Sequence, residues 1–245
     1  DQSGDPGGAE LCLIDIALLY RENCLVGLFA DGAFKHLLEE NDISVTVLSS
    51  KAIQVRKDSN LLQGLSSLFK LIPLIIQTVR FSRNYDLIYA NTPKALIIGA
   101  VVSYLRQRPL VYHLHDILSA DHFSWVNRRL IVVIANRFAS LIIANSKATT
   151  KAFNEAGGSS TLVKVVYNGF KPERYQIQED RVTLLRQELE FNGHFIIGHF
   201  SRLGPWKGQH ILLEALSYCP ENINAIFVGG AFFGVENYVQ KLHQK

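Results

Sequence analysis

Short apolar runs rich in β-branched residues alternate with amphipathic patterns along most of the chain. Most of the apolar runs are continuous, which is typical of parallel strands that are covered on both faces. A regular alternation of such strands with helices favours an α/β fold with right-handed crossovers. The predicted strands are Cys24–Phe29, Ser44–Leu48, Asp86–Ala90, Leu110–His113, Leu141–Ala144, Val163–Tyr167, Phe195–Phe200 and Ala225–Val228.

The segments between these strands carry apolar residues at helical spacing. Strands and helices in this order predict doubly wound, Rossmann-like sheets, in which ligands bind beyond the carboxyl ends of the strands. The predicted helices are Glu10–Arg21, Ala33–Glu40, Leu61–Arg80, Lys94–Leu105, Asn127–Ala139, Lys147–Ala156, Arg181–Leu189, Gly208–Cys219 and Phe233–Leu242.

A polar stretch with a proline follows the turn at Asn168-Gly169 and predicts a domain boundary. We expect a first domain at 1–172, a connector at 173–190 and a second domain at 191–245. The second is too short for a whole doubly wound domain of about 100 residues or more. The first lacks the strand that should precede its first glycine loop, and the chain has no Met. We therefore expect a trimmed chain, or a sequence from which some residues were dropped.

Composition narrows the class of protein. Apolar residues make up 48% of the chain and charged residues 19%, which allows a sizeable core and argues against disorder. The net charge of +3 comes with no long basic run, so we do not expect a nucleic-acid partner. Cys12, Cys24 and Cys219 form no C-x-x-C motif and are expected to be reduced core thiols of a cytosolic protein.

No secretory signal opens the chain, and its apolar stretches are too short or too interrupted to span a bilayer. Residues 61–80 combine a wide apolar face with Lys70 and Arg80. This leaves open a peripheral contact with the inner face of the membrane. The interpretation that we favour is a helix packed on the sheet.

Two cations mark the predicted junction between the strand Phe195–Phe200 and the helix Gly208–Cys219. Arg202 and Lys207 lie in the segment Ser-Arg-Leu-Gly-Pro-Trp-Lys-Gly-Gln. A helix start offers unpaired N–H groups and a dipole that favours negative charge, so this loop fits a diphosphate. The alternative is an ordinary solvated basic loop.

A second glycine-rich helix start lies near the other end of the chain, at Gly7 and Gly8. Between these two segments, short motifs follow the predicted strands in a fixed order. Together they resemble the family-four retaining glycosyltransferases of the GT-B fold, over nearly the whole chain. The motifs are Gly-Gly-Ala-Glu at 7–10, Tyr-Ala-Asn-Thr at 89–92, His-Leu-His-Asp at 113–116, Ile-Ala-Asn-Ser at 143–146, Val-Tyr-Asn-Gly at 166–169 and Ser-Arg-Leu…Trp-Lys-Gly-Gln at 201–209.

The resemblance implies two Rossmann-like domains, the second incomplete here, and an enzyme of polysaccharide biosynthesis. It implies transfer of a sugar from a UDP- or GDP-linked donor to a saccharide or lipid-linked acceptor, with retention and without a metal or other cofactor. It also places His115 opposite the donor sugar as a catalytic residue, together with Arg202 and Lys207. His113 is the main rival, because period-two spacing puts it on the same side of the strand. A purely structural histidine is the alternative for either.

The other site residues are predicted from their positions at the ligand-facing rim. Donor contacts are expected from Gly7, Gly8 and Gly229, besides the two cations. Acceptor contacts are expected at two helix starts, where N-capping is the plain alternative; these residues are Asn91, Thr92, Asn145 and Ser146. No Asp-x-Asp and no cluster of metal ligands stands in the sequence, so we predict no metal site.

Two other functions stay open. One is a nucleotide-sugar epimerase of GT-B-like fold, and the other is a non-catalytic ligand-binding module. The family's Glu-x7-Glu segment, which meets the donor, is absent from this sequence. We therefore expect this piece alone to be inactive.

Overall fold

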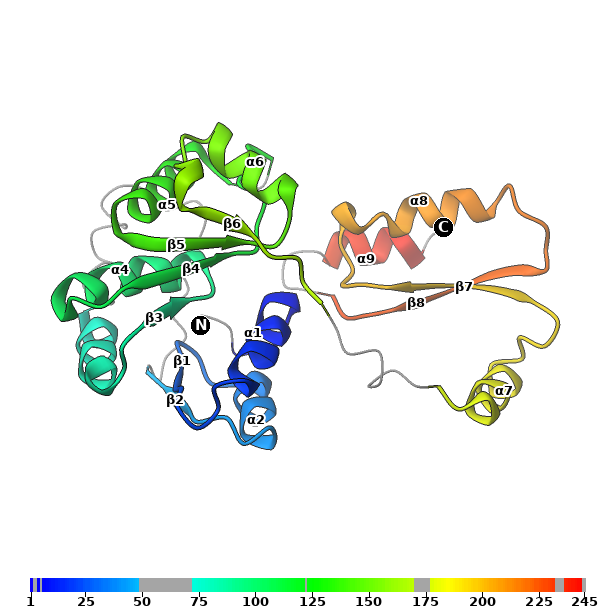
Figure 1. Ribbon diagram of the computed structural model, residues 1–245. Coiled ribbons are helices and arrows are strands. Elements are labelled where there is room, and N and C mark those ends of the chain that lie inside the picture. The colour runs from blue at the N-terminus through cyan, green and yellow to red at the C-terminus, as the bar shows by residue number, and fades with distance from the viewer. Residues whose placement is uncertain are drawn as a thin grey trace. The chain divides into compact units, whose positions relative to one another are not determined.

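The computed structural model describes residues 1, 4, 6–48, 72–121, 123–169, 177–231 and 236–243. The chain forms two compact units, Asp1–Gly169 and Phe170–Lys245, which we call unit 1 and unit 2. Figure 1 shows the elements of each unit. All strand pairs in both units are parallel among the described residues, which confirms the predicted α/β class.

Unit 1 contains a two-stranded sheet, β1-β2, and a four-stranded sheet in the order β3-β4-β5-β6. Each observed strand overlaps a predicted one, and the boundaries differ by a few residues at most. The strands are β1 (Val26–Leu28), β2 (Val45–Val47), β3 (Ile88–Ala90), β4 (Leu110–Leu114), β5 (Ala139–Ala144) and β6 (Val163–Val165).

Helices of unit 1 cover these sheets. Helix α4 packs on β3 and β4 and against α5, while α6 packs on β5 and β6. Residues 72–81 are also helical, which agrees with the end of the predicted helix Leu61–Arg80; the rest of that helix lies outside the described residues. The elements are α1 (Gly8–Leu18), α2 (Ala33–Glu40), η1 (Ser82–Asn84), α4 (Pro93–Arg106), α5 (Trp125–Phe138), α6 (Lys147–Glu155) and η2 (Ser160–Leu162).

Two hydrophobic clusters form the core of unit 1. The larger joins β4 and β5 to α4 and α5, and the smaller joins β1 to α1 and α2. Every residue of β4 is buried, as a continuous apolar run predicts. Burying one leucine or valine side chain of this strand contributes about 1.5–3 kcal/mol, so β4 is held firmly at the centre of the sheet.

Asp1 connects the two sheets of unit 1. Its amino group donates to the carbonyl of Gly27 at 2.5 Å, and its own carbonyl accepts from the N–H of Phe29 at 2.9 Å, so it pairs with β1. Its carboxylate accepts from Asn91 Nδ2 at 2.8 Å, just past the end of β3. The first residue thus fixes β1 relative to the end of β3.

Unit 2 is built around two parallel strands. Helix α8 packs on β8, and an isolated bridge between Leu203 and Ala231 extends the pairing beyond the strands. The elements are α7 (Glu179–Glu188), β7 (Phe195–Phe200), η4 (Pro205–Lys207), α8 (Gln209–Leu216), β8 (Ile223–Val228) and α9 (Glu236–His243).

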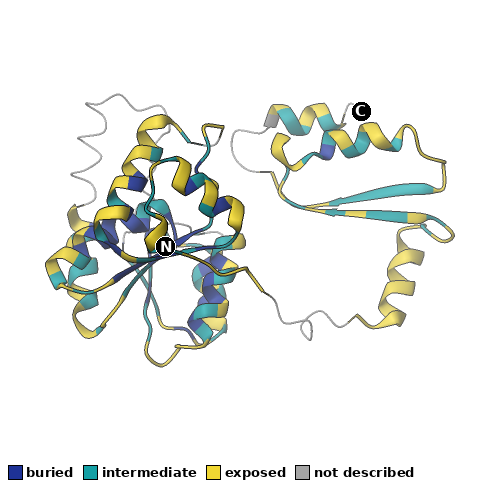
Figure 2. Ribbon diagram, turned by 45° about the horizontal axis from the view of Figure 1, so that its top comes forward, coloured by how far each residue is buried: buried dark blue, intermediate teal, exposed yellow. Residues whose placement is uncertain are grey.

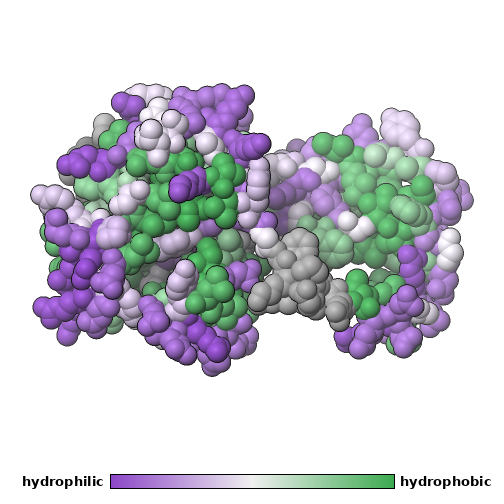
Figure 3. Space-filling view, in the orientation of Figure 1, coloured by the Kyte–Doolittle hydropathy of each residue, from purple (hydrophilic) through white to green (hydrophobic). Residues whose placement is uncertain are grey.

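The two units differ in burial, as Figure 2 shows by the dark blue that gathers in unit 1. Among the described residues of unit 2, only Gly204 and Gln209 are buried. Phe195 and Phe200 of β7 are 64% and 76% exposed, and apolar surface is visible on both units in Figure 3. The expectation of strands covered on both faces therefore holds for β4 and is wrong for β7.

The cysteines are free thiols. Cys12 and Cys24 are half-buried, but Cys219 is exposed near the end of α8, so the prediction of a core thiol is wrong there. No helix in the described part of the chain combines the length and the apolar character that crossing a membrane requires.

Candidate functional site

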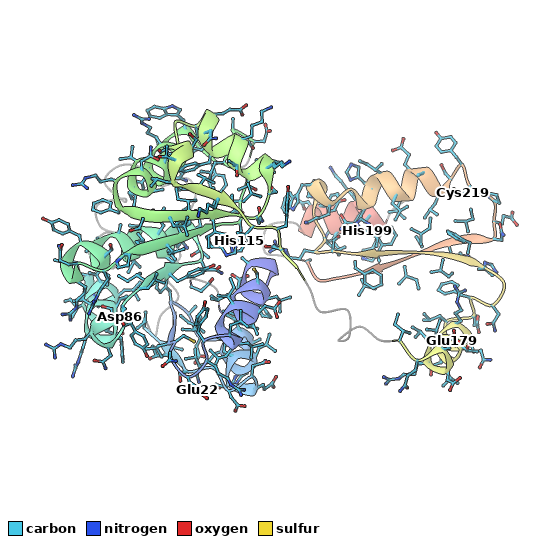
Figure 4. The ribbon with its side chains drawn as sticks, in the orientation of Figure 1. Glu22, Asp86, His115, Glu179, His199 and Cys219 are labelled. Carbon is cyan, nitrogen blue, oxygen red and sulfur yellow. The ribbon has the colours of Figure 1, made fainter. Side chains whose placement is uncertain are left out.

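Three neighbouring strands of unit 1 end at the same edge of the four-stranded sheet. Asn91 follows β3, His115 follows β4 and Asn145 follows β5. Figure 4 shows His115 at this carboxyl edge. Because ligands of open α/β sheets bind beyond the carboxyl ends of strands, this edge is the candidate site of unit 1.

The side chain of Asn91 is buried, with 2% of its surface exposed. Its Nδ2 donates to the Asp1 carboxylate at 2.8 Å and to the carbonyl of Ala9 at 3.1 Å. Its Oδ1 lies 2.9 Å from His115 Nε2. The first turn of α1 and the imidazole of His115 are thus joined through one amide.

Asn145 holds the same histidine by its backbone. Its Nδ2 donates to the carbonyl of His115 at 3.1 Å, and its Oδ1 accepts from Thr149 Oγ1 at 2.8 Å. The two asparagines therefore fix His115 from both neighbouring strands, one at the ring and one at the main chain. Sequence reasoning placed both at the rim but missed these contacts.

Thr92 and Ser146 cap the helices that follow. Thr92 Oγ1 accepts from the N–H of Ala95 at 3.3 Å, and Ser146 Oγ accepts from the N–H of Thr149 at 3.1 Å. The capping interpretation is confirmed for both. That these two residues, together with Asn91 and Asn145, bind the acceptor stays a prediction.

His113 lies on the same side of β4 as His115, with 3.9 Å between the ring centroids. It is 4% exposed, and its Nδ1 is 2.6 Å from the hydroxyl of Tyr89. Burial, reinforced by the neighbouring His115, lowers the pKa of His113 to about 4. Burial also raises the pKa of Tyr89 well above its ordinary value, so this hydroxyl keeps its proton.

His115 is only partly buried, and burial lowers its pKa; Asp116 opposes that shift. An imidazole with a lowered pKa is neutral at pH 7. The ring can therefore take part in hydrogen bonds as a donor at one nitrogen and an acceptor at the other.

The glycine loop at the start of α1 has room beside it. Gly7 is the N-cap residue, and its N–H donates to Glu10 Oε2 at 3.0 Å. A Cβ added at Gly8 would meet no atom within 4 Å. A helix start with open space next to its backbone can accept an anionic or polar ligand closely.

In unit 2, Arg202 and Lys207 are exposed on the loop between β7 and α8, as the sequence predicts. The loop is organised by Gln209, which is 1% exposed. Its Nε2 donates to Ser201 Oγ and to the carbonyl of Arg202, both at 2.9 Å, and its Oε1 accepts from the Tyr238 hydroxyl at 3.1 Å. The N–H of Gly204 also donates to that oxygen, at 3.5 Å.

Sequence reasoning included Gln209 in the motif but gave it no role. The available signal was a polar residue at the first position of the helix, directly after Gly208. Gly208 takes a left-handed conformation at φ 78°, which glycine adopts without strain, and so lets the chain turn into α8.

Gly229 ends β8 under a strong steric constraint. Its φ is 151°, and a Cβ there would lie 2.0 Å from the carbonyl oxygen of Ser201. This glycine is needed so that the segment after β8 can approach the loop that carries Arg202. A donor contact at Gly229 stays a prediction.

Each unit thus brings some of the predicted site residues together. Unit 1 brings the Gly7-Gly8 loop, Asn91, His115 and Asn145 together, and unit 2 brings Arg202, Lys207 and Gly229 onto one edge of its sheet. Within the residues that the structure describes, no three His, Cys, Asp or Glu side chains come together in a way that could hold a metal ion.

Comparison with known families and proteins agrees with this fold. Residues 6–174 match the family described as Glycosyltransferase Family 4. A capsular polysaccharide biosynthesis glycosyltransferase, CapM of Staphylococcus aureus, is 28% identical over 171 residues, which are 66% of this chain and 43% of that protein.

Among solved structures, Anabaena Alr3699/HepE in complex with UDP and glucose is 55% identical over the whole of this chain, with a TM-score of 0.89. The chain spans 63% of that protein's length. The UDP-GlcNAc 2-epimerase of Neisseria meningitidis is 12% identical with a TM-score of 0.57, over all of this chain and 68% of its own. That second likeness shows the fold alone.

Proposed function

Because this chain belongs to Glycosyltransferase Family 4, we propose that it forms part of an enzyme that transfers a sugar from a nucleotide diphosphate-sugar. The observation that carries the proposal is the 54% identity, over the whole chain, to Anabaena Alr3699/HepE, which has been crystallised with UDP-glucose. That likeness favours a UDP-linked donor over a GDP-linked one. The likeness to CapM, a glycosyltransferase of capsular polysaccharide biosynthesis, supports a saccharide acceptor, and a lipid-linked acceptor stays a prediction.

Arg202 and Lys207 are proposed to bind the donor pyrophosphate. Both are exposed on a loop that precedes a helix, and Gln209 fixes the backbone of that loop. A guanidinium can form two parallel bonds to phosphate oxygens, and an ammonium adds a mobile point charge. Together with helix-start N–H groups they would stabilise the charge that develops on the leaving diphosphate, without a metal.

Unit 1 is proposed to face the sugar and the acceptor. His115 would contact the transferred sugar, and the open space beside Gly8 would admit the donor, with Gly7 next to it. Gly229 of unit 2 is proposed as a further donor contact. Thr92, Asn145 and Ser146 would line the acceptor side together with Asn91. A lipid-linked acceptor would place the protein at the cytoplasmic face of a membrane.

The family resemblance supports transfer with retention. The bond between the anomeric carbon and the phosphate oxygen breaks, and the acceptor oxygen bonds to that carbon on the same face. The proton of the acceptor hydroxyl passes to the leaving phosphate. No protein nucleophile takes part in this scheme, and the cations of unit 2 carry the charge of the leaving group.

Substituting the two cations tests this proposal. In the whole protein, Arg202→Ala and Lys207→Ala should each lower turnover of UDP-glucose by about 10²–10³-fold, the usual effect of removing one oxyanion-stabilising donor. Lys241→Ala changes an exposed cation of α9 and is the matched control. UDP release is measured with and without acceptor, and with a chelator present.

The outcomes separate the functions. Unchanged turnover in both variants would contradict the phosphate role. An epimerised donor formed without acceptor would establish the epimerase instead. Binding of UDP without any turnover by the whole protein would support a non-catalytic module.

A further inference from the structure

We propose that Asn91 is a positioning residue that fixes His115 in its Nε2–H tautomer and so presents Nδ1 as a hydrogen-bond acceptor for a sugar hydroxyl. The part that concerns the sugar rests on the proposed function. The part that concerns the tautomer rests on the hydrogen bonds of unit 1 alone.

The orientation of the Asn91 amide is set by groups on its other side. The carbonyl of Ala9 can only accept hydrogen bonds, and the Asp1 carboxylate is also an acceptor. They lie 3.1 Å and 2.8 Å from the Asn91 nitrogen, so that nitrogen must be the NH₂ group. The remaining atom of the amide, Oδ1, therefore faces His115.

This orientation determines where the proton of His115 lies. An amide oxygen accepts and cannot donate, so the imidazole nitrogen 2.9 Å from it must carry hydrogen. Burial lowers the pKa of the ring, and the ring is therefore neutral at pH 7 and holds a single proton. That proton is on Nε2, which leaves the lone pair on Nδ1.

Packing also limits rotation of the ring. The ring of His113 packs against the imidazole at 3.9 Å between centroids, whereas Asn145 contacts only the backbone, at the carbonyl of His115 at 3.1 Å. The Tyr89 hydroxyl is hydrogen-bonded to Nδ1 of His113, so His113 does not compete with His115 for the Asn91 amide. Among the described residues, no hydrogen-bond partner stands at Nδ1 of His115.

An acceptor at this position restricts what His115 can bind. A lone pair attracts an O–H or N–H donor and repels the oxygens of an ionised phosphate or carboxylate. Within the proposed function, the side chain of His115 would therefore recognise a neutral hydroxyl of the sugar. Binding of the diphosphate would fall to the cations of unit 2.

Nitrogen-15 NMR of the histidine rings tests the tautomer on the chain as it is, with no need for catalysis. At pH 7.5 the Nε2 of His115 should show the shift of a protonated nitrogen and Nδ1 that of an unprotonated one. Asn91→Ala should convert this single state into a mixture of tautomers. Asn145→Ala, which removes the amide at the backbone carbonyl, should leave the tautomer unchanged.

A proton on Nδ1 in the unsubstituted chain would overturn the proposal, whether or not any variant folds. A tautomer that Asn91→Ala leaves unchanged would overturn it as well. Asn91→Asp gives a further readout, because a carboxylate beside Nε2 favours the imidazolium and should raise the pKa of His115. An unchanged pKa in that variant would contradict the contact.

The sugar part has its own measurement in the whole protein. Donor analogues in which one hydroxyl is replaced by fluorine, which cannot donate, should include one that loses about tenfold in affinity. That loss should disappear in His115→Ala. If no analogue behaves in this way while the NMR result holds, the tautomer stands and the sugar contact is wrong.

Discussion

In the described part of each unit, a buried amide lies among the predicted site residues, and the two amides do different things. Asn91 in unit 1 directs its oxygen at the imidazole of His115. Gln209 in unit 2 bonds to hydroxyl and backbone groups of the loop that carries Arg202 and Lys207. Unit 1 thus fixes the position of a proton, whereas unit 2 fixes the path of a backbone whose long cationic side chains lie exposed.

The two units also differ in how tightly a glycine is packed at each candidate site, and this difference gives the prediction with the largest effect. Gly229→Ala places a methyl group 2.0 Å from a backbone oxygen at φ 151°, whereas Gly8→Ala meets nothing within 4 Å. We expect Gly229→Ala to destabilise unit 2 by about 3 kcal/mol, through overpacking and backbone strain. Gly8→Ala should leave the stability of unit 1 unchanged or slightly raised, because alanine is the better helix residue.

Urea denaturation monitored separately for each unit measures both effects. If Gly8 is a donor contact, its variant should bind UDP-glucose more weakly although it is fully stable. A Gly229→Ala protein as stable as the parent would show that the approach of Ser201 to this glycine is not a constraint.

Gln209→Leu tests whether the loop of unit 2 depends on its amide. The change removes the acceptor of the buried Gly204 N–H, and a buried unpaired group costs about 1–3 kcal/mol; the Tyr238 hydroxyl keeps His210 Nδ1 as a partner. We expect a loss of about 2 kcal/mol in the stability of unit 2 and about a tenfold loss in UDP affinity. Calorimetric titration with UDP measures the latter.

The matched control is Gln187→Leu, the same substitution at an exposed position of α7. It should change neither quantity. Equal UDP affinity in the two variants would mean that Arg202 and Lys207 bind phosphate without a fixed backbone, and the contrast between the units would be lost.

The smallest predicted effect is a pH dependence confined to unit 1. His113 titrates at about 4 in the folded chain, against about 6.5 when unfolded. The unfolded state therefore binds the proton more readily, and stability falls as the pH drops from about 6.5 to about 4. We expect a loss of about 1–2 kcal/mol over this range.

Urea denaturation at pH 7.5 and pH 4.5 measures that loss. His113→Gln removes the titrating ring and should flatten the dependence by this amount. His199→Gln in unit 2 is the control and should leave the slope for unit 1 unaltered. The same slope in His113→Gln would assign the titration to another group.

The order and type of the elements could be predicted from the sequence because they depend on local patterns. Ala33–Glu40 and Phe195–Phe200 match observed elements residue for residue, since apolar periodicity and flanking glycines or turns define them. His115 could likewise be placed at a strand end. The predicted strand Leu110–His113 begins with the apolar run Leu-Val-Tyr, and β4 ends one residue after it, at Leu114.

The roles of the two amides could not be predicted, because their partners are distant in the sequence. Asn91 bonds to groups 90, 82 and 24 residues away, and Tyr238 is 29 residues from Gln209. A pattern of neighbours along the chain shows that a residue is polar and near a helix start. It does not show which way an amide faces, because that depends on tertiary contacts.

Which residues of unit 2 are buried could not be predicted from local sequence patterns either. An apolar run predicts a strand that could be covered, but coverage depends on which other segments pack over it. Phe200 of β7 and Cys219 after α8 are both exposed for this reason.

The backbone pairing of β4 with β5 ends at Leu114 and Ala144. The hydrogen bond from the Asn145 side chain to the carbonyl of His115 adds one more connection between the two segments. Freezing a mobile side chain on association costs about 0.5–1.5 kcal/mol. An imidazole that these contacts hold in the folded protein has lost that side-chain freedom during folding. An arriving molecule would then find the ring in place and could be recognised with little rearrangement.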